Sequence, residues 1–472
     1  MTVFLDNKNY YYETEKLIRL FFPFEQVLFN DTAPSNRTVL VREAFNKTFV
    51  TVNLNDKMFE AATEGTDEHS FLKILFLCFV KLTGYKPEWG MLTGIRPVRL
   101  YLKNKSISEQ HADKVFSEDF YVSDKKLNLL KQIADIEEPV IAASKPNSVS
   151  IYISVPFCPS RCDYCSFVSE STERALELMP EYVEFLCKEI AVTKEIVNNL
   201  GLKLESLYMG GGTPTTLSAK NLDKVLSALS NSFNIKNLEF TVEAGRPDTI
   251  SLDKLNVIRN FASRICINPQ SLNDNVLKAC RRKHSVKDFL NALNMAQNAG
   301  FKNINCDLIA GLPEDNIVSF SKSVDDLTKL DVSGITVHTL SYKRAANIYK
   351  DAKNNISDCR DISAMVNLAR EKLTSSGFLP YYLYRQSKAL GNLENVGFAK
   401  KGFYSAYNIF IMDETHSILG IGAGAVTKLR GYNSMDIERI YNYKYPFEYI
   451  SGFDEMIRRK NRIEEFYNID NQ

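Results

Sequence analysis

The stretch SVPFCPSRCDYCSF, residues 154–167, places Cys158, Cys162 and Cys165 within eight positions, whereas the other six cysteines stand apart from one another. Thiolates at the spacing C-x3-C-x2-C select soft metals, namely zinc or the iron of an iron–sulfur cluster. A structural zinc site is closed by four ligands, whereas three thiolates leave one iron of a four-iron cluster open. The same spacing would stack three side chains on one helix face, but Pro159 argues against a helix. A cluster is therefore favoured, with zinc as the alternative.

Short β-branched runs alternate with longer helical stretches from this region onward. The predicted strands cover residues 148–155, 204–210, 238–244, 263–269, 303–310 and 334–340. The predicted helices between them include residues 181–200, 218–233 and 285–300. Ser218 and Ser285 are the expected N-caps of two of these helices. Six β–α units in a row predict a parallel sheet, whose ligand site lies at the C-terminal ends of the strands.

Three glycines, at residues 210–212, follow the second of these strands in MGGGTPTTLS. Glycines let a backbone approach a ligand closely and offer it N–H and C=O groups. A tight turn from strand to helix explains the same run equally well. Because this run follows one strand after a three-cysteine loop, however, it specifically indicates a loop that binds a ligand. Glu243 and Gln270 end the next two strands at the same expected edge.

The cysteine loop and the glycine run together resemble the radical S-adenosylmethionine (SAM) enzymes. The chain resembles more closely the oxygen-independent coproporphyrinogen III oxidase (coproporphyrinogen dehydrogenase) family, and within it the HemZ-like branch. The resemblance covers roughly residues 148–430 through YISVPFCPSRCDYCSF, YMGGGTPTTL, VEAGRPD, RICINPQSL, RRKH, NCDLIAGLPEDN and GIGAGAV. LTGIRPVRLY (92–101) and PYYLYRQ (380–386) point to the HemZ-like branch. The resemblance implies an α/β fold: a partial (β/α)6 radical SAM barrel with an N-terminal α+β domain and a mostly helical C-terminal extension.

The resemblance also implies a 4Fe–4S cluster on Cys158, Cys162 and Cys165, with SAM chelating the open iron. The reduced cluster would then cleave SAM to a 5'-deoxyadenosyl radical. Tyr152 matches the family tyrosine near the cofactor, so we expect it to have a catalytic as well as a cofactor-binding role. The other expected contacts to SAM are Tyr164, Gly211, Gly212, Thr213, Glu243, Gln270, Arg282, Asp307 and Val426.

Six basic residues are candidates to hold the carboxylates of a tetrapyrrole, because arginine in particular binds carboxylates bidentately. They are Arg281, Lys283, His284, Lys343, Arg344 and Arg385. Each could equally be a solvated surface charge. The chain has YNIFIM (407–412) where the chaperone-like branch carries an HNxxYW-type stretch, and it lacks the pattern of the oxidase branch there too. The substrate therefore stays open.

The leading hypothesis is oxidative decarboxylation of two propionates of coproporphyrinogen III to vinyl groups, giving protoporphyrinogen IX in haem biosynthesis. The implied partners are a porphyrinogen substrate and a flavodoxin- or ferredoxin-like electron donor. One alternative is a haem-binding or haem-trafficking protein that keeps the cluster but has no decarboxylase activity. Another is a different radical SAM enzyme that acts on a tetrapyrrole.

The composition argues against several other classes of protein. Lys and Arg total 58 against 57 Asp and Glu, so no bulk positive charge attracts nucleic acid. The longest apolar stretch, residues 71–82, contains two lysines and is too short to span a bilayer. The N-terminus lacks the pattern of a secretory signal, and scattered single cysteines fit a reducing compartment. We expect a cytoplasmic protein.

Three domains are expected. Residues 1–145 predict a small α+β domain of unknown role, with a hairpin at residues 38–53 whose turn holds Asn46 and Lys47. Residues 146–360 would form the partial barrel. Residues 361–472 would form a C-terminal domain that covers the substrate side, with strands near YNIFIM and HSILGIG and a helical tail.

Overall fold

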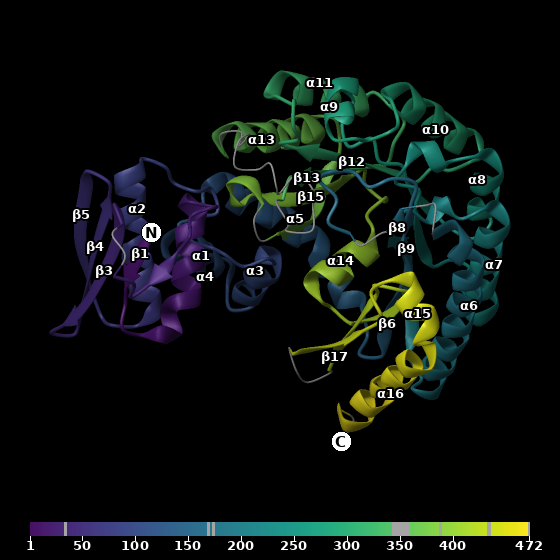
Figure 1. Cartoon of the computed structure of the whole chain (residues 1–472), viewed down its shortest axis with the longest axis horizontal. Helices are drawn as coiled ribbons and strands as arrows, with labels where there is room; N and C mark the ends of the chain where they lie inside the picture. The colour runs from purple at the N-terminus through teal and green to yellow at the C-terminus, as the bar shows by residue number, and fades with distance from the viewer. Residues whose placement is uncertain are drawn as a thin grey trace. The chain divides into compact units, whose positions relative to one another are not determined.

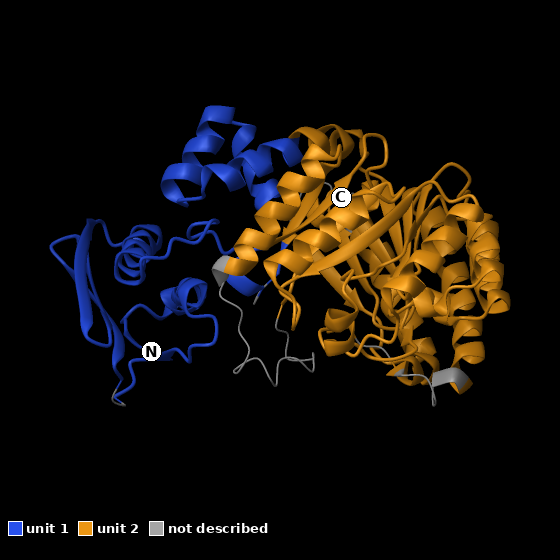
Figure 2. Cartoon of the chain, turned by 90° about the horizontal axis from the view of Figure 1, so that it is seen from above, with its two compact units in different colours: residues 1–134, 385–393 blue, residues 135–384, 394–472 orange. Residues whose placement is uncertain are grey.

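The computed structural model describes residues 1–32, 35–167, 170–171, 175–341, 359–386, 389–431 and 436–470. The chain folds as two compact units (Figure 2). Unit 1 comprises Met1–Ala134 and Arg385–Leu393, and unit 2 comprises Asp135–Tyr384 and Glu394–Gln472. The division into three domains at residues 145 and 360 stays a prediction.

Unit 1 contains a five-stranded sheet in the order β2-β1-β3-β4-β5. Its strands are β1 (Thr2–Phe4), β2 (Leu28–Phe29), β3 (Arg37–Ala44), β4 (Lys47–Leu54) and β5 (Lys57–Glu64). Its helices include α1 (Tyr11–Phe21), α2 (Glu68–Thr83), α3 (Pro97–Lys105), α4 (Glu109–Lys114) and the start of α5 (Asp124–Ala143). The apolar run at residues 71–82 lies in α2 and packs into the core of this unit.

The predicted hairpin of unit 1 is confirmed, but its turn lies one residue earlier than expected. Ala44 pairs with Lys47, so Lys47 already belongs to β4. The turn residues are Phe45 and Asn46, with φ of +53° and +58°. Two consecutive positive φ angles match the twist of the flanking strands, and asparagine tolerates this conformation well.

Unit 2 contains the predicted six-stranded parallel arrangement. Its strands are β6 (Ser148–Val155), β9 (Lys203–Gly211), β10 (Glu239–Glu243), β11 (Arg264–Cys266), β12 (Ile304–Ala310) and β13 (Gly334–Thr339). Each pairs in parallel with the next in chain order. Figure 1 shows helices as an arc outside these strands. They are α6 (Ala175–Asn199), α7 (Ala219–Ser232), α8 (Leu252–Arg259) and α10 (Val286–Asn298). The partial (β/α)6 barrel is thus confirmed.

The parallel strands are buried on both faces, and the residues on their two faces differ in character. In β6 the alternate residues Val149, Ile151, Ile153 and Val155 are fully buried apolar side chains. The residues between them, such as Tyr152, are polar. Because successive side chains of a strand point to opposite faces, one apolar face packs on the helices and one polar face lines the barrel interior.

Strands from the C-terminal part of the chain extend the sheet at both edges. At one edge β13 pairs antiparallel with β15 (Glu394–Ala399), which is followed by β14 (Leu379–Arg385). At the other edge β16 (Ser417–Ile421), which confirms the strand near HSILGIG, pairs in parallel with β6. Beyond it lie β17 (Val426–Arg430) and β18 (Ile437–Tyr441). Other helices of unit 2 include α9 (Asp274–Ala279), α11 (Ile317–Thr328), α13 (Cys359–Ser375), α15 (Pro446–Ser451) and α16 (Phe453–Asp470).

The strand expected near YNIFIM is wrong, because these residues form helix α14 (Ala406–Asp413). The side chain of Ser405 caps the helix by accepting a hydrogen bond from the N–H of Asn408. The carboxylate of Glu239, distant in sequence, accepts from the N–H groups of Ala406 and Tyr407. An anion at a helix N-terminus stabilises the helix, and this contact cannot be seen in the local pattern.

None of the helices in the described part of the chain is both long and apolar enough to cross a membrane.

Candidate functional site

The cysteine loop follows the C-terminal end of β6, as the sequence predicts. Cys162 is buried, and Cys158 and Cys165 are half-buried. The N–H of Asp163 donates to the carbonyl oxygen of Cys280 at 3.2 Å, which ties the loop to the end of α9. Burial, together with the thiols of Cys158 and Cys162, raises the pKa of the Cys165 thiol to about 11. A bound cation would favour the thiolate form of this group.

The glycine run packs directly against the cysteine loop. Gly211 has a φ of +106°, a conformation that residues with a side chain rarely adopt. A Cβ atom at Gly212 would lie 2.5 Å from the carbonyl oxygen of Phe157. The N–H of Thr213 donates to that same oxygen at 2.7 Å, and its Oγ1 lies 3.3 Å from Sγ of Cys158. Close packing of the two loops thus gives a structural reason for these glycines.

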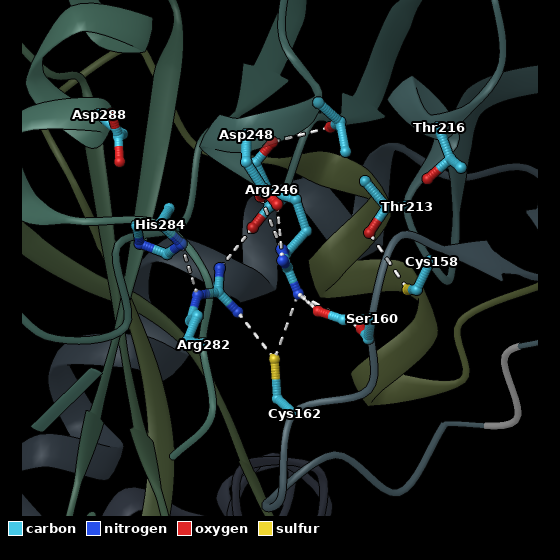
Figure 3. Close-up of polar contacts among 12 residues, drawn as sticks. Cys158, Ser160, Cys162, Thr213, Thr216, Arg246, Asp248, Arg282, His284 and Asp288 are labelled. Atoms are coloured by element: carbon cyan, nitrogen blue, oxygen red, sulfur yellow. Dashed lines mark hydrogen bonds and ion pairs between the residues drawn. The ribbon is translucent and has the colours of Figure 1, made fainter. Parts of the chain in front are cut away.

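Arg282 contacts three of the predicted site segments, and Figure 3 shows its contact with Cys162. Its Nη2 donates to the carbonyl oxygens of Gly245 and Asn268, both at 2.6 Å. Its Nη1 donates to the hydroxyl of Tyr164 at 2.6 Å and lies 3.7 Å from Sγ of Cys162. The guanidinium therefore fixes the position of Tyr164 beside the thiols.

The segment RRKH, residues 281–284, alternates between exposed and buried side chains. Arg281 is 73% exposed and forms an ion pair with Asp163 at 3.0 Å, and Lys283 is also exposed. Arg282 and His284 are buried, and Nε of Arg282 donates to Nδ1 of His284 at 3.1 Å. Burial and the nearby arginine charges lower the pKa of His284 to about 3, so it is neutral near pH 7. Neutral His284 carries no charge that would attract a carboxylate.

The other basic candidates lie elsewhere. Lys343 and Arg344 fall outside the described residues. Arg385 is buried in unit 1, where its Nη1 donates to the carbonyl oxygens of Leu92 at 2.7 Å and Gly94 at 3.2 Å. In this structure Arg385 thus holds the LTGIRP segment.

Arg246 is a site residue that the sequence does not predict. It follows β10, and its Nη1 lies 3.5 Å from Sγ of Cys162. Its Nε and Nη2 donate to the two carboxylate oxygens of Asp248 at 2.8 and 2.7 Å. The signal that could have found it is its place in VEAGRPD, directly after a parallel strand.

Glu243 lies in the polar interior of the barrel. The hydroxyl of Tyr208 donates to one carboxylate oxygen, and Nδ2 of Asn268 donates to the other at 3.2 Å. Burial and the charge of Asp307 raise the pKa of Glu243 to about 7. A partner that donates to the carboxylate would lower this pKa again.

Asp307 on β12 is held by two neighbours. Nδ2 of Asn305 donates to one carboxylate oxygen at 2.9 Å, and Nε2 of His338 lies 3.4 Å from the other. Burial alone would lower the pKa of His338, but the Asp307 carboxylate outweighs burial and raises it. Nδ1 of His338 lies 3.3 Å from the hydroxyl of Tyr384. His338, at the end of β13, is a second residue that the sequence does not predict.

Gln270 and Asn268 present buried oxygen atoms that lack a donor among the described residues. These atoms are Oε1 of Gln270 and Oδ1 of Asn268. Gln270 has a φ of +67°, and its N–H donates to the carbonyl oxygen of Asp307 at 2.9 Å. A buried polar atom without a partner is costly, so these two oxygens indicate a missing donor.

Tyr152 lies on β6 and Val426 on β17, and β16 lies between these two strands. Tyr152 pairs with Gly420 of β16, and a Cβ atom at Gly420 would lie 2.8 Å from the backbone of Val426. The ring of Tyr152 stacks on that of Tyr208, with centroids 6.3 Å apart. All the predicted cluster and SAM residues belong to unit 2.

The donor set fits a 4Fe–4S cluster and SAM. Among the described residues, no three His, Cys, Asp or Glu side chains converge as ligands of a single metal ion. In a cluster each thiolate binds a different iron, so its ligands need not converge on one point. Three thiols beside two guanidiniums suit an anionic cluster, and the unpaired oxygens of Gln270 and Asn268 suit a ligand with amino groups.

Comparisons with known proteins show which proteins this chain is similar to. Residues 152–327 match the family described as "Radical SAM superfamily". Over 395 residues the chain is 37% identical to the "Oxygen-independent coproporphyrinogen-III oxidase-like protein HemZ" of Bacillus subtilis (strain 168), covering 81% of this chain and 79% of that protein. Over 326 residues it is 29% identical to the "Heme chaperone HemW" of Lactococcus lactis, covering 68% of this chain and 80% of that protein.

The fold is similar to that of coproporphyrinogen III oxidase (HemN) from Escherichia coli, described as a radical SAM enzyme. The TM-score is 0.53 at 21% sequence identity, and the match covers 69% of this chain and 73% of that chain.

Proposed function

The chain belongs to the radical SAM superfamily and, within it, to the oxygen-independent coproporphyrinogen III oxidase-like family that includes HemZ, and from this premise we propose that it decarboxylates coproporphyrinogen III. Two propionates become vinyl groups, giving protoporphyrinogen IX. At each propionate a hydrogen atom would pass from the β-carbon to the 5'-deoxyadenosyl group, which leaves as 5'-deoxyadenosine. The bond from the α-carbon to the carboxylate then breaks, CO2 departs, and one electron passes to an external acceptor.

The main support for this proposal is the set of groups that lie at the C-terminal ends of the first four barrel strands. Three thiols, a glycine run and two buried oxygens without donors lie there together. Bound at this site, a 4Fe–4S cluster and SAM supply hydrogen-atom abstraction from an unactivated carbon, which is the chemistry that a propionate β-carbon requires.

Four side chains of the site have a defined task in this proposal. Glu243 accepts hydrogen bonds from ribose hydroxyls, as acidic residues do in dinucleotide-binding folds. The oxygens of Gln270 and Asn268 accept from amino groups of the cofactor. Arg282 holds the Tyr164 ring in place. The partners are a porphyrinogen and a one-electron donor of the flavodoxin or ferredoxin type.

Haem binding without decarboxylation is the second candidate function. It is favoured by the similarity to HemW, although identity to HemZ is higher, at 37% against 29%.

Product analysis under anaerobic conditions tests the proposal. The protein is reconstituted with iron and sulfide and mixed with a reductant, SAM and coproporphyrinogen III, and both products are measured by mass spectrometry. Loss of two CO2 units with matching 5'-deoxyadenosine is expected, and the Cys162→Ala variant should give neither product. Deoxyadenosine with unaltered coproporphyrinogen would overturn the decarboxylase. Tight haem binding without deoxyadenosine would favour the second candidate.

A further inference from the structure

Arg246 is a buried cation whose contacts the proposed function does not explain. Its side chain is 3% exposed. One edge of the guanidinium is bidentate on Asp248, at 2.8 and 2.7 Å. The opposite nitrogen, Nη1, donates to the carbonyl oxygen of Ser160 at 3.3 Å, to its Oγ at 3.1 Å and to Sγ of Cys162 at 3.5 Å (Figure 3).

Asp248 anchors Arg246 independently of the cysteine loop. Burial raises the pKa of the Asp248 carboxyl, but the hydrogen bonds and charge of Arg246 outweigh burial and lower it, so the pair is ionised. The backbone around the pair is fixed as well, since Oγ1 of Thr249 donates to the carbonyl oxygen of Arg246 at 2.7 Å. A bidentate pair fixes the orientation of the guanidinium, which therefore points at the loop whether or not the loop holds metal.

Arg282 also approaches Cys162, but its donors are committed differently. Two of its nitrogens serve carbonyl oxygens and the hydroxyl of Tyr164, and the contact to sulfur is longer, at 3.7 Å. Of the two arginines, Arg246 therefore makes the shorter contact with Sγ of Cys162.

We propose that Arg246, anchored by Asp248, sets the reduction potential of the cluster through the sulfur of Cys162. Reduction adds one electron, taken from an external reductant, and leaves the cluster with one more negative charge. A buried positive charge and an N–H directed at a ligand sulfur both favour the reduced state. This inference rests on the cluster of the proposed function but not on its substrate.

The test is a potentiometric titration of the reconstituted protein with dithionite, followed by the EPR signal of the reduced cluster. In Arg246→Gln, the ratio of reduced to oxidised cluster at a fixed potential should fall about tenfold, a shift of about 59 mV for one electron. The matched control is Arg281→Gln, which removes the same charge beside the same loop from an exposed site. Because water and salt screen an exposed charge, its shift should be much smaller.

The Asp248→Asn variant tests whether Asp248 acts by anchoring Arg246 or by its own negative charge, because the two roles shift the reduction potential in opposite directions. Removing an anion near the cluster would by itself favour reduction and raise the potential. If Asp248 acts by holding Arg246, the potential falls instead. Arg246→Lys, which keeps the charge but loses the bidentate contact, should lie between wild type and Arg246→Gln.

Three outcomes would overturn the proposal. The first is a wild-type potential in Arg246→Gln, and the second is a raised potential in Asp248→Asn. The third is a failure of the folded Arg246→Gln, Arg246→Lys and Asp248→Asn variants to assemble a cluster. The last would assign Arg246 to assembly alone. A wild-type protein that holds no cluster would instead refute the proposed function.

Discussion

At the scale of single residues, the three cysteines of the loop are expected to be essential, and other cysteines are not. Cys162→Ala should abolish binding of iron and sulfide, because two thiolates cannot replace three in holding a cluster. Cys187 on α6 is a half-buried thiol outside the loop, so Cys187→Ala is the matched control and should keep the cluster. Iron and acid-labile sulfide analysis checks both variants. Full cluster content in Cys162→Ala would contradict the assignment.

Glu243 should couple SAM binding to pH. Its pKa, raised to about 7 by burial and by Asp307, means that a proton competes with ligand donors near neutral pH. SAM should therefore bind more tightly to the cluster-loaded protein at pH 8 than at pH 6, in calorimetric titrations. Glu243→Gln should weaken binding about tenfold at pH 8, the cost of one hydrogen bond to a charged group, and flatten the pH dependence.

The raised pKa of Glu243 makes the folded protein less stable as the pH rises, whereas the same rise in pH makes SAM binding stronger. An unfolded glutamate ionises near pH 4.5, whereas Glu243 in the folded protein ionises near pH 7. Its contribution to stability is full below pH 4.5 and is lost as the pH rises to 7. Glu243→Gln should therefore stabilise the ligand-free protein at pH 8, measured by thermal unfolding. A lower melting temperature at pH 8 would show that the pKa is not raised.

At the scale of elements, the turn after β9 and the cysteine loop act as one packed unit. A Cβ atom at Gly212 would lie 2.5 Å from the carbonyl oxygen of Phe157, so Gly212→Ala should displace the loop. We expect a cost of about 1–3 kcal/mol in the free energy of unfolding, as for overpacking, together with a loss of cluster content. Gly94→Ala is the control, because a Cβ atom there meets nothing within 4 Å. Equal effects from the two variants would contradict the packing argument.

At the scale of the whole molecule, the C-terminal helix α16 is locked onto unit 2 by a buried ion pair. Lys460 and Glu189 lie 3.0 Å apart, with 1% and 0% of their side chains exposed. Glu189 also accepts from the N–H of Gly422 in the turn between β16 and β17. Lys460→Met would leave a buried carboxylate without its counter-charge and should cost about 3–5 kcal/mol in the free energy of unfolding.

The control for this prediction comes from the same helix. Arg462 pairs with Glu438 at 2.7 Å, but both side chains are more than 30% exposed. Arg462→Met should therefore cost about 1 kcal/mol or less, measured by denaturant unfolding. Similar losses in the free energy of unfolding for the two variants would show that burial does not make the Lys460–Glu189 pair more important for stability.

The barrel was predictable because parallel strands in a βα series carry a strong periodic signal, and all six lie where expected. Candidate site residues could be predicted where they end or directly follow these strands, as Glu243 and Gln270 do. Arg246 obeys the same rule within VEAGRPD, whereas His338 lies near the end of β13 without a motif of its own. Helix α14 was missed because a short apolar run does not distinguish strand from helix, and its cap from Glu239 is distant in sequence.

The proposed function requires that the cluster keep one open iron for SAM, as three cysteine ligands rather than four would allow. The most direct measurement is the EPR spectrum of the reduced, reconstituted wild-type protein with and without SAM. We predict a cluster signal that changes when SAM is added, as its amino and carboxylate groups bind the open iron. A signal that SAM leaves unchanged, or a purified protein that holds zinc and no sulfide, would contradict the account.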